Sequence, residues 1–182
     1  MEYILFLRGI NVGGKHKVVM AELRQDLSQL GLDSVKSYIN SGNLYFVSNL
    51  TEDALETLLE EYFNSHYDFP IAFALLSGPA FQAEMDNQPN WWQENLARRD
   101  VLFFSRRVNR QEVEASLASM SLGNEEVFLG QRAVFWGKRD EADYLKTAYH
   151  KQLGKQAYYS EVTIRNAKTC DKMLTFLQHT QE

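Results

Sequence analysis

Cysteine is almost absent from this sequence, which contains only Cys170 in 182 residues. One cysteine cannot form a disulfide within the chain, and no Cys/His pair has the spacing of metal ligands, so we expect neither disulfides nor a zinc site. We predict no metal and no cofactor. A lone cysteine is typical of a reducing compartment, so we predict a cytoplasmic protein in which Cys170 is buried or unreactive.

Long hydrophobic runs are also missing. The apolar run over residues 3–7 is too short for a signal peptide or a membrane helix, so we expect no association with a membrane. Positive charge is not in excess, because 19 Lys and Arg residues stand against 24 Asp and Glu residues, for a net charge of -5. Nucleic acid is therefore not the expected partner, and any anion binding must be local.

The apolar content is sufficient for a core, with 45% apolar and 24% charged residues. In the first half, runs of strand formers alternate with apolar residues at helical spacing, and Gly31, Thr51 and the turn 40–43 mark the ends of elements. The predicted order is strand, helix, strand, strand, helix and strand, over residues 3–7, 19–30, 35–39, 44–47, 51–62 and 70–76.

The second half repeats this order after a short helix over 80–85 and a linker over 87–90. Residues 128–136 can be laid over residues 38–46 so that apolar strand, polar turn and aromatic strand match, which indicates a structural duplication. The predicted elements cover residues 101–104, 109–120, 127–129, 133–136, 140–154 and 158–164, and a last helix capped by Asn166 covers residues 167–177.

These patterns predict an α+β fold made of two tandem ferredoxin-like βαββαβ halves with a C-terminal helix. The halves are residues 1–88 and residues 89–182, in one compact unit, with equivalent hairpin turns at 40–43 and 130–132. Both alternating faces of the first strand are apolar, so its sheet is expected to be covered on both sides. Either the two halves join through their sheets, or a second chain covers the open face.

The loop after the first strand has an unusual composition. Residues 7–17 contain three glycines and three cations and no acid, and Gly9 to Lys15 match the spacing of a phosphate-binding loop. His16, however, stands where that motif needs Ser or Thr for Mg²⁺, and the following helix leads into an antiparallel hairpin rather than a parallel sheet. A Walker-type ATPase is therefore excluded.

The same loop has the features of a simpler anion site. Glycine amides ahead of a helix suit a phosphate or a carboxylate, and this helix has no acid before Glu22. We predict that the loop binds a small anionic ligand, a nucleotide or a carboxylated metabolite; the alternative is a surface loop whose glycines serve only backbone geometry. The predicted ligand-binding residues are Arg8, Asn11, Gly13, Gly14, Lys15, Asn43, Arg165 and Asn166.

In this hypothesis Arg8 pairs with the anion, Lys15 adds charge, and Asn43 or Asn166 orients the ligand. Asn43 also has a turn role that explains its presence. Arg165 joins the site only if the last helix begins on the side where the loop lies; otherwise it is a solvated surface cation. No catalytic group of residues is apparent, so the hypothesis covers a binding protein and an enzyme of undefined type.

Two alternatives concern larger partners. The first is single-stranded nucleic acid bound by aromatic rings among cations, although Phe103 and Phe104 alternate between strand faces and at least one is expected in the core. The arginines around these rings are Arg98, Arg99, Arg106, Arg107 and Arg110. The second is a non-catalytic interaction module that forms a homodimer through its sheet face.

Three motifs along the chain carry a family resemblance. They are Leu-Arg-Gly-Ile-Asn-Val-Gly-Gly at 7–14, Ser-Gly-Asn at 41–43 and Ile-Arg-Asn-Ala at 164–167. With these motifs the chain resembles, over essentially its whole length, a bacterial family of unknown function in which the last motif is expected to be Thr-Arg-Asn-Trp. The resemblance implies one compact α+β unit and a role for the three motif regions, but no activity.

Overall fold

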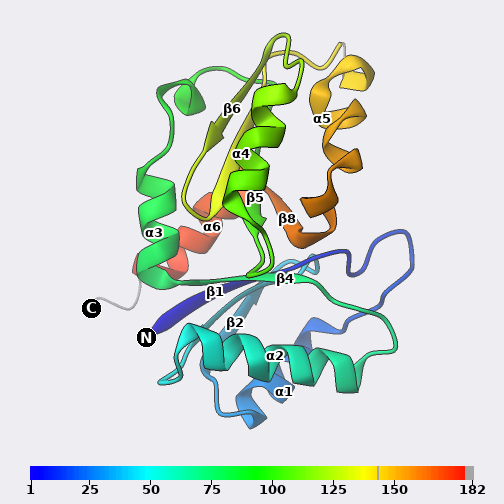
Figure 1. Cartoon of the computed structure of the whole chain (residues 1–182). Coiled ribbons are helices and arrows are strands. Elements are labelled where there is room, and N and C mark those ends of the chain that lie inside the picture. Colours follow the sequence, from blue (N-terminus) through cyan, green and yellow to red (C-terminus); the bar gives the residue numbers. More distant parts are fainter. Residues whose placement is uncertain (143, 179–182) are drawn as a thin grey trace. The chain divides into compact units, whose positions relative to one another are not determined.

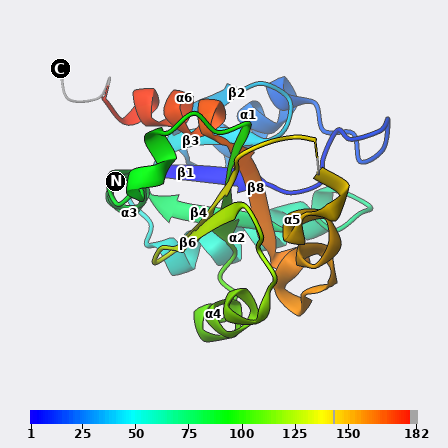
Figure 2. The same cartoon turned by 90° about the horizontal axis from the view of Figure 1, so that it is seen from above.

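The computed structural model describes residues 1–142 and 144–178. Two four-stranded antiparallel sheets, with strand orders β2-β3-β1-β4 and β6-β7-β5-β8, form its framework (Figure 1). In each sheet the first strand lies between the third and the fourth, as Figure 2 shows for β1 between β3 and β4. The predicted α+β fold of two tandem βαββαβ units with a C-terminal helix is confirmed.

The elements of the first unit follow from local sequence. α1 places Leu23 and Leu27, one turn apart, on its buried face. The Thr51 hydroxyl caps α2 by accepting a hydrogen bond from the Ala54 amide at 3.3 Å. The elements are β1 (Glu2–Leu7), α1 (Met20–Gln29), β2 (Asp33–Tyr38), β3 (Asn43–Val47), α2 (Glu52–His66) and β4 (Phe73–Ser77).

The second unit repeats the order with more irregular helices. Two of its caps are the predicted ones: Asn109 Oδ1 accepts from the Gln111 amide at 3.0 Å, and Asn166 Oδ1 accepts from the Thr169 amide at 2.9 Å. The elements that follow β4 are α3 (Gly78–Asp86), β5 (Arg98–Phe104), α4 (Arg110–Ser119), β6 (Glu125–Leu129), β7 (Ala133–Lys138), α5 (Ala148–Lys151), β8 (Val162–Asn166) and α6 (Ala167–Gln178), with 3₁₀ turns at Asn90–Gln93, Tyr144–Lys146, Leu153–Lys155 and Ala157–Glu161.

Two predictions for residues 140–164 are wrong. The continuous helix expected over 140–154 is broken, because Thr147 has an extended backbone and its hydroxyl starts a new helix by accepting from the His150 amide at 3.2 Å. The strand expected from Tyr158 begins at Val162 instead, because residues 157–161 form a 3₁₀ helix that buries Tyr158 against α4, where its hydroxyl is 2.9 Å from Ser116 Oγ.

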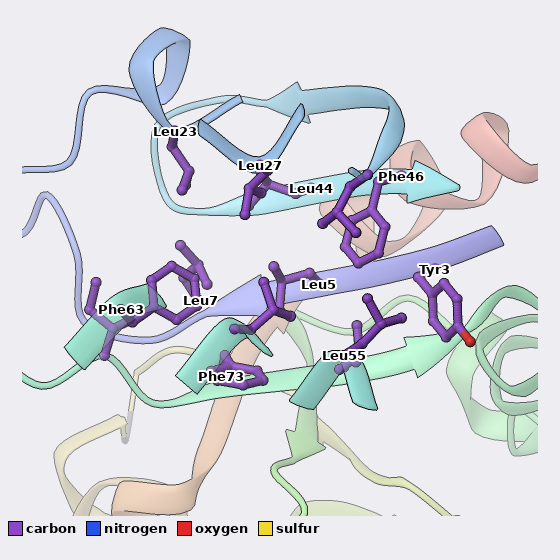
Figure 3. Close-up of a cluster of buried hydrophobic side chains, with 14 of the residues drawn as sticks. Tyr3, Leu5, Leu7, Leu23, Leu27, Leu44, Phe46, Leu55, Phe63 and Phe73 are labelled. Atoms are coloured by element: carbon purple, nitrogen blue, oxygen red, sulfur yellow. The ribbon is translucent and has the colours of Figure 1, made fainter. Parts of the chain in front are cut away.

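The core of the first unit lies between its sheet and two helices. Figure 3 shows Leu5 and Leu7 of β1 on the face that also carries Leu44 and Phe46 of β3. The helices α1 and α2 cover this face with buried apolar side chains, among them Leu23, Leu27, Leu55, Leu59 and Phe63. Complete removal of such side chains from water is the main stabilising contribution to this unit.

The opposite face of β1 is also buried. Ile4 and Phe6 have no exposed surface, and the Phe6 ring lies 5.9 Å from the ring of Phe81 in α3. The Tyr45 ring of β3 lies at the same distance from Phe176 of α6. Both faces of β1 are thus buried, as its apolar alternation predicts.

The two hairpins differ in length. Both predicted turns join the second and third strands of their units, but Ser37 pairs with Leu44 while Leu129 pairs with Val134. The connection is residues 39–42 in the first unit, where Tyr38 still pairs with Asn43, and residues 131–132 in the second, where the Gly130 amide donates to Ala133 O at 2.8 Å. When residues 38–46 are laid over residues 128–136, β3 aligns with β7, whereas β2 is displaced from β6 by about two residues. Because side chains alternate along a strand with a period of two, this displacement keeps each side chain on the same face of the sheet.

By its internal contacts the chain divides into residues 1–82 with 171–182, and residues 83–170. This division differs from the sequence-based boundary at residues 88 and 89, and it assigns the part of α6 from Asp171 to the first unit. Among the described residues, none of the helices combines the length and apolarity needed to cross a membrane. Cys170 is buried, as predicted.

Gly42 allows the first hairpin to pass close to β1. Its φ of +83° is left-handed, and a Cβ there would lie 2.6 Å from Leu7 Cβ. Gly42→Ala should therefore lower the free energy of unfolding by about 2–4 kcal/mol, through backbone strain and overpacking together. Urea denaturation followed by circular dichroism measures this loss.

The matched control is Gly31→Ala. Gly31 has a similar φ of +87° but open space where its Cβ would be. Only the conformational cost of about 1–2 kcal/mol is expected there. Equal losses at both positions would show that the close approach to Leu7 contributes nothing.

Candidate functional site

The predicted glycine-rich loop is a small hairpin. The Asn11 amide donates to His16 O and the Lys15 amide donates to Val12 O, both at 3.0 Å. Gly13 and Gly14 between them have φ values of +57° and +73°, which are those of a type I′ turn. The two glycines therefore form an exposed hairpin tip, and α1 begins later, with Val19 as its N-cap residue.

Asn11 fixes this hairpin to the body of the first unit. Its side-chain nitrogen donates to Val18 O at 2.9 Å and to Asn40 O at 2.7 Å, while its side-chain oxygen accepts from the Val18 amide at 2.9 Å. Both amide protons are thus used within the protein. Asn11 holds the loop against the turn after β2, which differs from its predicted role as a direct ligand.

An open depression lies beside the hairpin. It is lined by Gly14, Lys15, His16, Lys17, Asp68 and Phe69. The His16 ring stacks on the Phe69 ring with centroids 4.6 Å apart and an angle of 19° between the planes. Asp68 follows α2 in the chain, so the fold brings an acid to a loop that contains none of its own. Two lysines, one histidine and one carboxylate face the same space.

The structure places Arg8 and Asn43 at the base of this loop. The amides of Leu7 and Arg8 donate to Gly42 O and Ala72 O, each at 2.8 Å, which holds the end of β1 between two neighbouring segments. Asn43 is completely buried, and its side-chain nitrogen donates to Tyr38 O at 3.0 Å. Asn43 therefore stabilises its own hairpin, as its turn role predicts.

Arg165 and Asn166 belong to the second unit. Arg165 is only 9% exposed and donates to Ile164 O at 2.8 Å, so it is not a solvated surface cation. Burial lowers the pKa of its guanidinium to about 10. Asn166 caps α6 through the bond to Thr169 described above. The convergence of Arg8 and Arg165 on one ligand stays a prediction.

The surface proposed for single-stranded nucleic acid lacks its stacking rings. Phe103 and Phe104 are both buried, with 0% and 4% of their surfaces exposed. Two of the surrounding arginines make structural hydrogen bonds, since Arg99 donates to Trp92 O and Arg110 to Gly130 O, each at 2.8 Å. Bases cannot stack on rings that lie in the core.

Sequence reasoning missed a group of buried charges on the second sheet. Asp100, Glu125 and Lys138 are 5%, 6% and 1% exposed. Lys138 pairs across the sheet with Glu125 of β6 and Arg98 of β5, and these side chains share the face that carries Trp136. β7 extends to Lys138, beyond the predicted strand end at residue 136, and its alternation places Lys138 on the core side.

These charges shift one another's protonation. Burial, and after it the charge of Arg98, lower the pKa of Lys138 to about 8, although the charges of Asp100 and Glu125 act in the opposite direction. Burial raises the pKa of Asp100, against the effect of Arg98 and Lys138. Among the described residues, no group of three His, Cys, Asp or Glu side chains is arranged to hold a metal ion.

Comparison with known proteins gives relatives without an assigned activity. The model of a family described as "Protein of unknown function (DUF1697)" matches residues 1–135. A solved structure, described as that of the conserved bacterial protein SP0830 from Streptococcus pneumoniae, is 50% identical to this chain, with a TM-score of 0.92, and the match covers 97% of this chain and 98% of the other. Comparison with curated proteins gives no match.

Removal of the Asn11 side chain should loosen the loop. Asn11→Ala deletes three hydrogen bonds and should lower the free energy of unfolding by about 1–3 kcal/mol, because the partly buried backbone groups of Val18 and the exposed Asn40 O lose their partner. Limited proteolysis should then cut within residues 11–16 faster than in the wild type. Asn40→Ala is the control, since Asn40 contributes a backbone oxygen that alanine retains. Equal effects of the two changes would contradict this role of Asn11.

Proposed function

The chain belongs to the DUF1697 family of proteins of unknown function, and from this premise we propose that it binds a small anionic ligand in the depression beside residues 9–17. The ligand class is the one that the sequence suggests, a nucleotide or a carboxylated metabolite. The observation that carries the proposal is the pair of exposed lysines, Lys15 and Lys17, in a depression that the Gly14 backbone also lines.

The rigidity of the loop supports binding. Asn11 ties the hairpin to the turn after β2, and the stack of His16 on Phe69 holds its return strand against the residues after α2. His16 Nδ1 also lies 3.1 Å from Gly9 O. A loop that is already ordered loses little conformational entropy when a ligand arrives, so modest electrostatic attraction is enough for binding.

The turn type adds backbone donors. In a type I′ turn the hydrogen bond of the turn uses the amide of the fourth residue, here Lys15, and not the amides of the two central residues. The Gly13 and Gly14 amides are therefore available at the tip to a phosphate or carboxylate oxygen, beside the Lys15 ammonium. Arg8, at the base of the loop, adds positive charge there.

Asp68 favours one ligand class over another. A carboxylate in the depression repels a bare phosphate, but it accepts hydrogen bonds from the hydroxyl groups of a sugar. A nucleoside monophosphate presents both groups, with its phosphate for the lysines and its ribose hydroxyls for Asp68. We therefore propose the nucleotide as the better ligand. The single, buried Cys170 agrees with a reducing compartment such as the cytoplasm.

Calorimetric titration of the full chain with AMP, succinate and inorganic phosphate tests this proposal. AMP should bind most tightly, and the double change Lys15→Ala with Lys17→Ala should weaken AMP binding by about 10-fold or more, since each lost charge contact contributes about 0.5–1 kcal/mol. The melting temperature without ligand should stay nearly constant, because both lysines are exposed.

Two control variants make the result specific. Lys155→Ala with Lys168→Ala removes the same charge from exposed positions of the second unit and should leave AMP binding unchanged. Asp68→Asn should weaken AMP binding relative to phosphate binding. Equal AMP affinity of the two double variants would refute the proposal, and a steep loss of affinity with salt for oligonucleotides, but not for AMP, would indicate nucleic acid instead.

A further inference from the structure

The group of charges around Lys138 lies at one end of the inner face of the second sheet. Arg98 and Asp100 come from β5, Glu125 from β6 and Lys138 from β7, and the pairing of Arg98 and Glu125 with Lys138 puts all of them on that face. The same face continues into the apolar cluster of Leu102, Val134 and Trp136. Burying a charge at the end of a core costs desolvation free energy, which is recovered only where the charge is paired or hydrogen-bonded.

Glu125 is fully used by the fold. Its carboxylate accepts from Trp136 Nε1 at 2.9 Å, from the Ala148 amide at 2.6 Å and from the Tyr149 amide at 3.1 Å. It thereby fixes the start of α5 to the sheet. Within the described residues Glu125 makes no hydrogen bond to Lys138 Nζ, and it acts on this amine through its charge.

Lys138 is in a different situation. Its Nζ is buried and makes no hydrogen bond within the described part of the chain, and the same is true of Asp100 Oδ2. Two aromatic rings enclose the nitrogen: Nζ lies 3.5 Å from the centre of the Tyr149 ring and 4.5 Å from that of Tyr144. The amine is thus held in place by rings, and none of the described residues uses its hydrogen-bonding capacity.

Arg98 completes the surroundings. Its guanidinium lies 5.3 Å from the centre of the Tyr144 ring, and its Nη2 is 4.0 Å from Asp100 Oδ2. The Arg98 side chain is 41% exposed, so it reaches from the buried amine to the solvent. At these distances neither contact is a hydrogen bond, so the guanidinium fork can still bind a carboxylate.

The cover over the amine is thin. Tyr144 belongs to a 3₁₀ turn, Tyr144–Lys146, and its neighbour Leu145 is 66% exposed. A short turn with few buried contacts opens at low cost compared with the strands beneath it. A small molecule can therefore reach Lys138 by displacing this turn without unfolding the sheet.

We propose that Lys138 is the nucleophilic amine of a second site, separate from the loop, which binds a small aldehyde or 2-oxo acid as a Schiff base. Arg98 binds the carboxylate of the 2-oxo acid, Asp100 moves the protons, and Tyr144 and Tyr149 hold the amine and exclude water. The site needs no metal and no oxidant, because imine formation is a condensation.

The reaction balances with these residues alone. The Nζ lone pair of the neutral amine attacks the carbonyl carbon, and the carbonyl oxygen takes a proton from the Asp100 carboxyl. The nitrogen then returns a proton to the Asp100 carboxylate, and the hydroxyl of the carbinolamine takes this proton and leaves as water while the C=N bond forms, which gives a protonated imine beside the Asp100 carboxylate. When the imine nitrogen passes its proton to this carboxylate, one amine and one carbonyl have given one neutral imine and one water, and the Asp100 carboxyl is restored.

The protonation states fit this chemistry. The pKa of Lys138, lowered to about 8 by burial, leaves a substantial neutral fraction near neutrality, where a lysine of ordinary pKa about 10.4 has roughly 100-fold less neutral amine. Burial raises the pKa of Asp100, so its carboxyl holds a proton more readily than a surface aspartate. Besides Arg98, Asp100 and Glu125, the charge of Glu141 also acts on Lys138.

Reductive trapping tests the proposal on the wild-type chain. The protein is incubated at pH 7.5 with glyoxylate and cyanoborohydride, which reduces an iminium to a stable secondary amine, and modified lysines are located by peptide mass spectrometry. Lys138 should be modified about 10-fold faster than the exposed Lys36, because burial lowers the pKa of Lys138 and so increases the share of neutral Lys138 amine. Modification of Lys138 no faster than Lys36 would overturn the proposal and leave Lys138 as a structural cation between two rings.

Lys36 is a matched reference within the same chain. Its Nζ also lies near two rings, 5.4 Å from the centre of Tyr45 and 5.9 Å from that of Phe176, but the residue is exposed on a strand. Faster reaction at Lys138 is therefore attributable to its buried surroundings and not to aromatic contact. Because this comparison uses one unaltered protein, it does not depend on whether a variant folds.

The carboxylate preference isolates the role of Arg98. Arg98→Gln should reduce the trapping rate with glyoxylate several-fold and leave the rate with acetaldehyde, which has no carboxylate, nearly unchanged. An equal reduction with both aldehydes would contradict a carboxylate contact at Arg98. Lys138→Met should abolish adducts at this position while AMP binding at the loop persists, which separates failure of this proposal from failure of the first.

Discussion

Backbone pairing of the two central strands fixes the position of every functional candidate in this protein. β1 pairs with β3 and β4 along its length, and β5 pairs in the same way with β7 and β8. Each central strand is buried on both faces, so a shift of one residue would turn buried side chains toward the wrong face. The register of each sheet is therefore fixed, and it determines which residues of neighbouring strands and turns lie beside the ends of β1 and β5.

The consequences differ in the two units. At the end of β1 the chain leaves beside Gly42, and the loop reaches the neighbouring turn, where Asn11 binds Asn40 O. At the beginning of β5, cross-strand pairing sets Arg98 opposite Lys138. One topology thus produces a hairpin with exposed charges in the first unit and a buried group of charges in the second.

The second arrangement has an energetic cost. A buried ammonium that has no hydrogen-bond partner among the described residues loses hydration that two tyrosine rings only partly replace, and an apolar side chain of similar length would fill the space without this loss. Glu125 shows the contrast, because three donors offset its burial. Unsatisfied charge of this kind is concentrated where proteins do chemistry, which is the physical ground for considering Lys138 further.

The sequence by itself determined the features that depend on near neighbours. The order of elements, the caps at Thr51 and Asn166, and the turn residues at 40–43 follow from hydrogen bonds and periodicity within a few residues. It also located the basic loop. It did not show that Gly13 and Gly14 form a hairpin tip, because both a turn and an anion-binding loop use glycine.

Only the tertiary structure decided which distant residues meet. Asp68, which follows α2, lies beside the basic loop. Lys138 lies near Asp100, which precedes it by 38 residues, and near Tyr149, which follows it by 11 residues. Arg165, an ordinary charge in the sequence, is buried. Spacing along the chain carries no information on such pairs, because strand register and the path of the covering segments are set by the burial of the whole core, to which every element contributes at once.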